Sequence, residues 1–126
     1  MGVFTKRVLF AHWERRATAE VDAIIDLGSS SCVVPESLAS LLGLQQVGTA
    51  EFVLADGRVA ELPVAGLRVE LEGRVAFITT AIGPVDAKPI LGASALEVLG
   101  LGVEPGTEKL IPEVIRLLTM TGWRTV

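Results

Sequence analysis

The residues best placed to do chemistry are the four of the segment Asp26-Leu27-Gly28-Ser29, which directly follows an apolar run at residues 21–25. An apolar strand that ends in a carboxylate and a glycine turn presents that carboxylate from a rigid edge, where neighbouring groups tune its protonation. A carboxylate held in this way serves as a general acid or base. The pattern therefore favours chemistry at Asp26 over a role in solubility.

Two further motifs follow along the chain. An Ala-Asp-Gly triplet at residues 55–57 lies between the apolar arms 52–54 and 59–62, a pattern that predicts a β-hairpin with a type I′ turn. An apolar pair followed by glycine occupies residues 90–92, before a segment with the pattern of a short helix. An Asp-x-Gly triplet alone arises often by chance, so the order of the three motifs is the informative feature.

The ordered set resembles the retropepsin-like aspartic peptidases, the retroviral-type and bacterial single-domain enzymes of clan AA. Members of that family carry Asp-Thr-Gly or Asp-Ser-Gly, an Ala-Asp-Gly type flap tip, and an apolar-apolar-Gly motif before the last helix. The resemblance runs from about Ala17 to Pro112. The matching positions in this chain are Asp26, Leu27, Gly28 and Ser29 for the active-site turn, Ala55, Asp56 and Gly57 for the flap, and Ile90, Leu91 and Gly92 for support of the turn.

The resemblance implies a homodimeric endopeptidase that acts on an extended peptide or protein substrate. Two aspartates must share a proton and activate a water, and this chain holds one Asp-x-Gly turn, so the second would be Asp26 of a symmetric copy. Gly28 would let the two turns approach closely, and Ser29 would donate a hydrogen bond to the carboxylate. Residues 55–57 would cover the peptide, and residues 90–92 would pack beneath the turn.

Leu27 departs from the family pattern, in which Thr or Ser follows the aspartate and its hydroxyl reaches the backbone of the other subunit. Losing two such hydrogen bonds costs on the order of 1–3 kcal/mol. A buried leucine offsets about 1.5–3 kcal/mol of this per copy, but the geometry of the two turns would be looser. A second function therefore stays open: a catalytically impaired dimer of the same fold that acts as a peptide-binding or structural module.

The elements that must position these residues are mostly strands. The sequence predicts a single domain over residues 1–112 that is mostly β, a half-barrel of antiparallel strands with one or two short helices. Residues 113–126 form a tail, a possible dimer-interface strand, in which helix and strand are both open. The expected strands lie at residues 3–10, 17–25, 52–54, 59–62, 64–71, 75–82 and 109–111, and the expected helices at 35–44 and 94–99.

Composition narrows the partners. The net charge of −4 and the scattered Lys and Arg residues argue against nucleic acid. One cysteine (Cys32, a predicted core residue) and one histidine (His12) provide neither a disulfide nor a metal site, so no cofactor is expected. The chain shows no apolar run of membrane-spanning length and no signal-peptide pattern, which predicts a cytoplasmic protein without a membrane partner. A mean hydropathy of +0.54 favours an apolar subunit interface.

Overall fold

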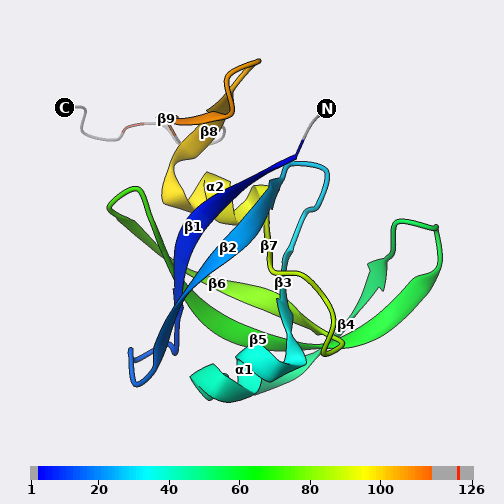
Figure 1. Cartoon of the computed structure of the whole chain (residues 1–126). Coiled ribbons are helices and arrows are strands. Elements are labelled where there is room, and N and C mark those ends of the chain that lie inside the picture. Colours follow the sequence, from blue (N-terminus) through cyan, green and yellow to red (C-terminus); the bar gives the residue numbers. More distant parts are fainter. Residues whose placement is uncertain (1–2, 115–121, 123–126) are drawn as a thin grey trace.

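Six strands of the computed structural model close into a barrel, and a seventh strand lies outside it (Figure 1). The structure describes residues 3–114 and residue 122. The strand order around the ring is β1-β2-β7-β3-β6-β5, and pairing of β1 with β5 closes it, while β4 pairs with β5 alone. The elements are β1 (Phe4–Ala11), β2 (Thr18–Asp26), β3 (Cys32–Pro35), α1 (Glu36–Leu42), β4 (Gln46–Val53), β5 (Val59–Leu71), β6 (Arg74–Gly83), β7 (Ile90–Gly92), α2 (Ala93–Leu99), β8 (Leu101–Glu104) and β9 (Lys109–Pro112).

The prediction of a mostly β chain with two short helices is confirmed. Most pairings are antiparallel, as expected, but β2 pairs with β7 and β3 with β6 in parallel. Parallel neighbours require a long connection between them, and here each pair is separated by other elements of the barrel. The two parallel pairs bring the ends of β2 and β7 together, and this is the edge that carries Asp26.

The core follows the period-2 alternation of the barrel strands. Every second side chain of β1, β2, β5 and β6 points inward, which buries a single apolar cluster beneath the two helices. Thr80 is the one buried polar residue among those described, and no buried side-chain nitrogen or oxygen in that part of the chain lacks a hydrogen-bond partner. The largest fully buried side chains are Phe10, Ile25, Leu42, Leu67, Leu91 and Leu96.

Both predicted helices are present, and each ends at a glycine. Gly43 follows α1 with φ 66° and Gly100 follows α2 with φ 71°, the left-handed conformation in which glycine avoids a Cβ penalty. Helix α1 is shorter than the predicted 35–44, because Pro35 has ψ 151° and is the N-cap rather than the first helical residue. Predicted helix bounds are therefore less reliable than predicted helix ends at glycine.

The predicted type I′ turn at the Asp-Gly motif is wrong, although the hairpin itself is present. A type I′ turn needs positive φ at both central residues, and only Gly57 has it (φ 88°). The amide of Gly57 instead donates to the carbonyl of Leu54 (2.9 Å), and the amide of Leu54 donates to the carbonyl of Arg58 (2.7 Å), which leaves a three-residue loop. Positive φ at two successive residues occurs at Glu72-Gly73, between β5 and β6.

Three short strands were not predicted, and the last predicted strand has an unexpected partner. Strands β3, β7 and β8 have three or four residues each. The predicted strand 109–111 is present as β9, yet it pairs with β8 in a separate two-stranded sheet rather than with the barrel (Figure 1). The predicted tail begins at residue 113, and its residues 115–121 and 123–126 lie outside the described residues.

Candidate active site

Asp26 is the last residue of β2 and lies opposite Gly92 of β7. Its side chain is half-buried, and its Oδ1 accepts a hydrogen bond of 2.9 Å from the backbone N–H of Gly28. The N–H of Ser29 donates to the carbonyl of Asp26 (3.1 Å) and closes the turn. A Cβ at Gly28 would lie 3.2 Å from Oδ1, so the glycine allows the amide to approach the carboxylate closely. The carboxylate is thus oriented by its own turn, and its Oδ2 accepts no hydrogen bond from any described residue.

The predicted bond from the Ser29 hydroxyl to the carboxylate is not formed. Ser29 Oγ donates instead to the carbonyl oxygen of Ser31, at 2.7 Å. A hydroxyl has a single proton to donate, so this bond removes Ser29 as a donor to Asp26. The Gly28 amide takes the place predicted for Ser29, whose hydroxyl tightens the loop after the turn.

The Asp26 turn is attached to the start of α2 by backbone hydrogen bonds. The N–H of Ala93 donates to the carbonyl of Ser29 (2.7 Å), and the N–H of Ser94 donates to that of Ser30 (3.1 Å). The first N–H groups of a helix have no partner within the helix, and here the loop satisfies two of them. Sequence reasoning missed this contact because backbone atoms make it, and no residue type marks them.

Gly92 allows the loop and α2 to come this close. A Cβ on Gly92 would overlap the carbonyl oxygen of Ser31 and lie 2.6 Å from that of Ser29. Both obstacles are backbone atoms, which cannot rotate away as a flexible side chain can. The structure therefore brings Asp26, Gly28, Ser29 and Gly92 into one unit, with Ile90 and Leu91 beside Ile24 and Ile25 in the parallel pairing below them.

Leu27 is the outermost residue of the turn, with 39% of its surface exposed. It lines two surface hollows, of about 600 and 420 Å³, and Val103 of β8 lines both of them as well. Phe4 borders the smaller hollow, and Leu96 and Val114 border the larger. An apolar surface therefore surrounds the residue next to Asp26.

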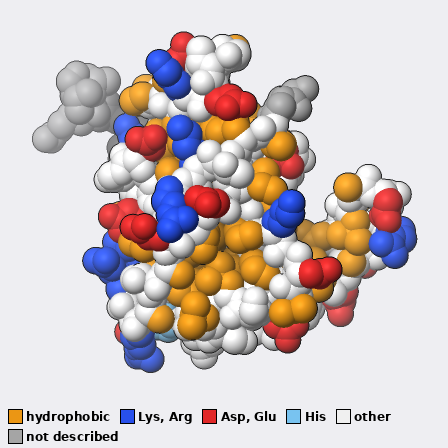
Figure 2. Space-filling model, in the orientation of Figure 1, with side chains coloured by type: hydrophobic (Ala, Val, Ile, Leu, Met, Phe, Trp, Pro, Cys, Tyr) orange, Lys and Arg blue, Asp and Glu red, His pale blue; other side chains and the backbone are white. Residues whose placement is uncertain are grey.

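The predicted flap residues Ala55, Asp56 and Gly57 form the tip of the β4–β5 hairpin, away from the Asp26 turn (Figure 1). Figure 2 shows this hairpin standing out from the body of the molecule, with acidic and basic side chains near its end. The backbone N–H and the guanidinium of Arg58 both bond to the Asp56 carboxylate (3.0 and 2.7 Å) and hold its pKa below the usual value. Among the described residues, no hydrogen bond or ion pair joins this tip to the turn.

Cys32, the predicted core residue, is fully buried in β3, and desolvation raises the pKa of its thiol to about 11. Below that pH the thiol stays protonated, so at pH 8 roughly a thousandth of it is the reactive thiolate. We expect iodoacetamide at pH 8 to leave the native protein unlabelled over an hour and to label it fully in denaturant, as intact-mass spectrometry would show. Rapid labelling of the native protein would contradict the buried position.

The described part of the chain offers no metal centre and no helical membrane span. Within residues 3–114 no three His, Cys, Asp or Glu side chains cluster closely enough to hold a metal ion. Neither described helix is long and apolar enough to cross a bilayer. The chemistry of the Asp26 turn is therefore considered with its own carboxylate and peptide groups.

Comparison with known proteins gives structural matches only. No family model and no curated protein sequence matches the chain. The EIAV protease, solved in complex with an inhibitor, is similar with a TM-score of 0.57 and 18% identity, over 79% of this chain and 89% of the protease. The protease of simian foamy virus (mac), solved in solution, is similar with a TM-score of 0.50 and 18% identity, over 72% of this chain and 91% of the protease.

Proposed function

From the retropepsin-like fold, which this chain has in common with two viral proteases, we propose that the protein is a homodimeric aspartic endopeptidase. The main support is the position of Asp26. Its carboxylate ends a barrel strand, accepts the Gly28 amide, and sits in a turn attached to Gly92 and the start of α2. A carboxylate fixed in this manner, with one oxygen left without a protein partner, suits an acid or base that acts on a bound water.

The proposed chemistry needs two such turns. Two carboxyl groups close together cannot both ionise easily, so a pair of Asp26 residues holds one proton between them. The charged member takes a proton from water as the water oxygen attacks the peptide carbonyl carbon. The protonated member donates its proton to the substrate, and the amine leaves when its nitrogen has been protonated. One chain supplies a single Asp26 turn, so the site is complete only in a dimer.

The surface around Leu27 supports a symmetric pairing. Leu27 is the residue next to Asp26 and projects between two hollows bordered by Phe4, Val103 and Val114. In a two-fold dimer with the Asp26 turns at the axis, Leu27 of each copy reaches the matching surface of the other. Burying a leucine contributes roughly 1.5–3 kcal/mol per copy, in place of the hydroxyl contact that the family sequence pattern implies.

Sedimentation velocity at micromolar to 100 µM protein tests the dimer directly. We expect a monomer–dimer equilibrium that shifts toward the dimer as concentration rises, because the two Leu27 surfaces bury each other. Digestion of a mixed peptide library from pH 4 to pH 8 then tests the activity. A protein that stays monomeric over the whole range would contradict the proposal, since one Asp26 cannot form the pair.

A second candidate function, a catalytically impaired dimer that binds peptides or serves as a structural module, is favoured by one observation. Leu27 has no hydroxyl, so nothing at this position fixes one turn to the other by a hydrogen bond. Small misplacements of catalytic groups reduce rates strongly. A dimer of the same fold could therefore persist with little activity.

The variant Leu27→Thr separates the two candidates. For an active wild type we expect a change in kcat/KM of less than about 10-fold, since the hydroxyl adds roughly 0.5–1.5 kcal/mol per copy to an already working pair. Leu41→Thr, at an exposed leucine of α1, is the matched control. An inert wild type together with a Leu27→Thr variant that cleaves the library would instead establish the impaired module.

A further inference from the structure

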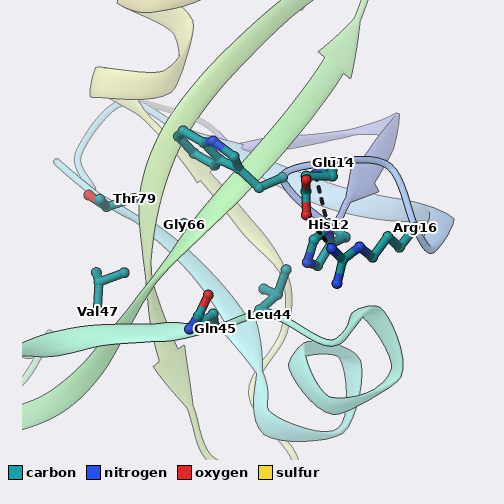
Figure 3. A pocket seen from close by; sticks show the side chains of 9 residues that line it. His12, Glu14, Arg16, Leu44, Gln45, Val47, Gly66 and Thr79 are labelled. Atoms are coloured by element: carbon teal, nitrogen blue, oxygen red, sulfur yellow. Dashed lines mark hydrogen bonds and ion pairs between the residues drawn. The ribbon is translucent and has the colours of Figure 1, made fainter.

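A cavity of about 440 Å³ lies at the opposite end of β2 from Asp26, which is roughly 30 Å along a nine-residue strand. It is formed where the β1–β2 turn meets the segment that leads into β4, beside β5 and β6. Figure 3 shows His12, Glu14 and Arg16 gathered at one end, Val47 and Thr79 at the other, and Leu44 and Gln45 between them. The cavity has the volume of a small-molecule site, for which 300–1,000 Å³ is usual.

The wall of the cavity includes an aromatic ring that is exposed yet held in place. Trp13 has 48% of its surface exposed. Its ring meets Phe77 edge to face, with centroids 4.9 Å apart. It also lies so close to β5 that a Cβ on Gly66 would be 3.0 Å from its Cε3 atom. A fixed indole that keeps part of its surface in water offers a flat apolar partner at little entropic cost.

The polar end of the cavity presents hydrogen-bond donors. His12 Nδ1 accepts the backbone N–H of Glu14 at 2.9 Å, so Nε2 carries the proton of the neutral ring and is a donor. Arg16 Nη2 lies 2.7 Å from Glu14 Oε1, and this contact neutralises the carboxylate. A guanidinium has five N–H groups in a fork that matches carboxylate oxygens, so one contact to Glu14 leaves donors for a second anion.

We propose that this cavity, which we call the Trp13 pocket, binds a planar aromatic ligand that carries a carboxylate. The ring of the ligand lies against Trp13, Leu44 and Val47, and the carboxylate accepts hydrogen bonds from Arg16 and His12. Such a group occurs both in free aromatic acids and in the C-terminal aromatic residue of a peptide. Nothing in this assignment depends on chemistry at Asp26.

Titration of the ¹⁵N-labelled full chain with two probes, followed by amide chemical shifts, tests the site. The probes are indole-3-acetate and the peptide N-acetyl-Gly-Gly-Trp with a free carboxylate. For ligands of this size we expect dissociation constants on the order of 0.1–1 mM, with shift changes centred on the lining residues. Binding of the acid assigns the site to free aromatic acids, and binding of the peptide alone assigns it to chain ends. Absence of binding by both probes at 5 mM overturns the proposal.

Two variants on the surface establish where and how the probes bind. Arg16→Gln is expected to weaken indole-3-acetate roughly 5–20-fold and to leave the neutral analogue indole-3-ethanol unchanged, because only the acid uses the guanidinium. Thr79→Tyr fills the cavity from an exposed strand position and is expected to remove binding of both. Arg58→Gln, at the far hairpin tip, is the charge-matched control. Unchanged binding in Arg16→Gln and Thr79→Tyr, each with wild-type dispersion of amide shifts, also overturns the proposal.

Discussion

Replacing Asp26 by asparagine is expected to lower kcat/KM for peptide cleavage by roughly 10⁴-fold or more, because each lost acid or base role is worth 10²–10⁴. Asparagine has nearly the same size, and its carbonyl oxygen can still accept the Gly28 amide that now bonds to Oδ1 at 2.9 Å. The turn and its attachment to α2 should therefore persist. In the proposed dimer the substitution removes both exchangeable carboxyl protons of the pair at once.

A matched control is available in the same strand. Asp22 lies four residues before Asp26, is exposed, and pairs with Arg7 at 3.2 Å. Asp22→Asn should leave both cleavage and melting temperature close to wild type, because an exposed ion pair contributes little. Rates from a fluorogenic form of the best library peptide, with the melting temperature of each variant, make the comparison. Full cleavage by Asp26→Asn would move the chemistry away from this turn.

Replacing Gly92 by alanine is expected to destabilise the fold by about 2–4 kcal/mol, as overpacking against an unyielding neighbour does. The backbone at Gly92, with φ −89° and ψ 179°, is open to alanine, so the cost is steric and not conformational. The added methyl meets the carbonyl oxygens of Ser29 and Ser31. To make room, the loop must move away from α2 and lose the hydrogen bonds to Ala93 and Ser94.

Gly48→Ala is the control, since a Cβ at Gly48 meets no atom within 4 Å. Urea unfolding followed by circular dichroism gives the free energy of unfolding of both variants, with Gly48→Ala expected within about 0.5–1 kcal/mol of wild type. Any activity of Gly92→Ala should fall further than its stability, because the displaced loop carries Asp26. A Gly92→Ala variant as stable as Gly48→Ala would show that the contact is loose.

The sequence predicts the elements that carry a local signal. Alternating apolar residues predict β1, β2, β5 and β6, and the glycines that end α1 and α2 predict where those helices stop. The Asp-Gly motif predicts a hairpin at the right place. The long strand β5 was split in two at Pro63, but its pairing with β4 and β6 continues on either side of the proline.

The features that sequence reasoning missed depend on distant partners. Strands β3 and β7 are too short for a periodic pattern, and they exist because β2, β6 and each other satisfy their backbone groups. The donor to Asp26 is an amide, which every residue but proline has, so residue type favoured the hydroxyl of Ser29 instead. The Asp-Gly turn type depended on the conformation of Asp56, which composition does not determine.

The attachment of the Asp26 turn to β7 and α2 also governs when the site can exist. The turn lies in the first quarter of the chain, whereas its partners Gly92, Ala93 and Ser94 lie in the last third. A ribosome therefore has to release most of the barrel before the carboxylate can be fixed in place. A nascent or truncated chain that ends before Gly92 lacks the ordered turn, so any hydrolytic capacity is withheld until synthesis is nearly finished, which protects the translation machinery from a half-made enzyme.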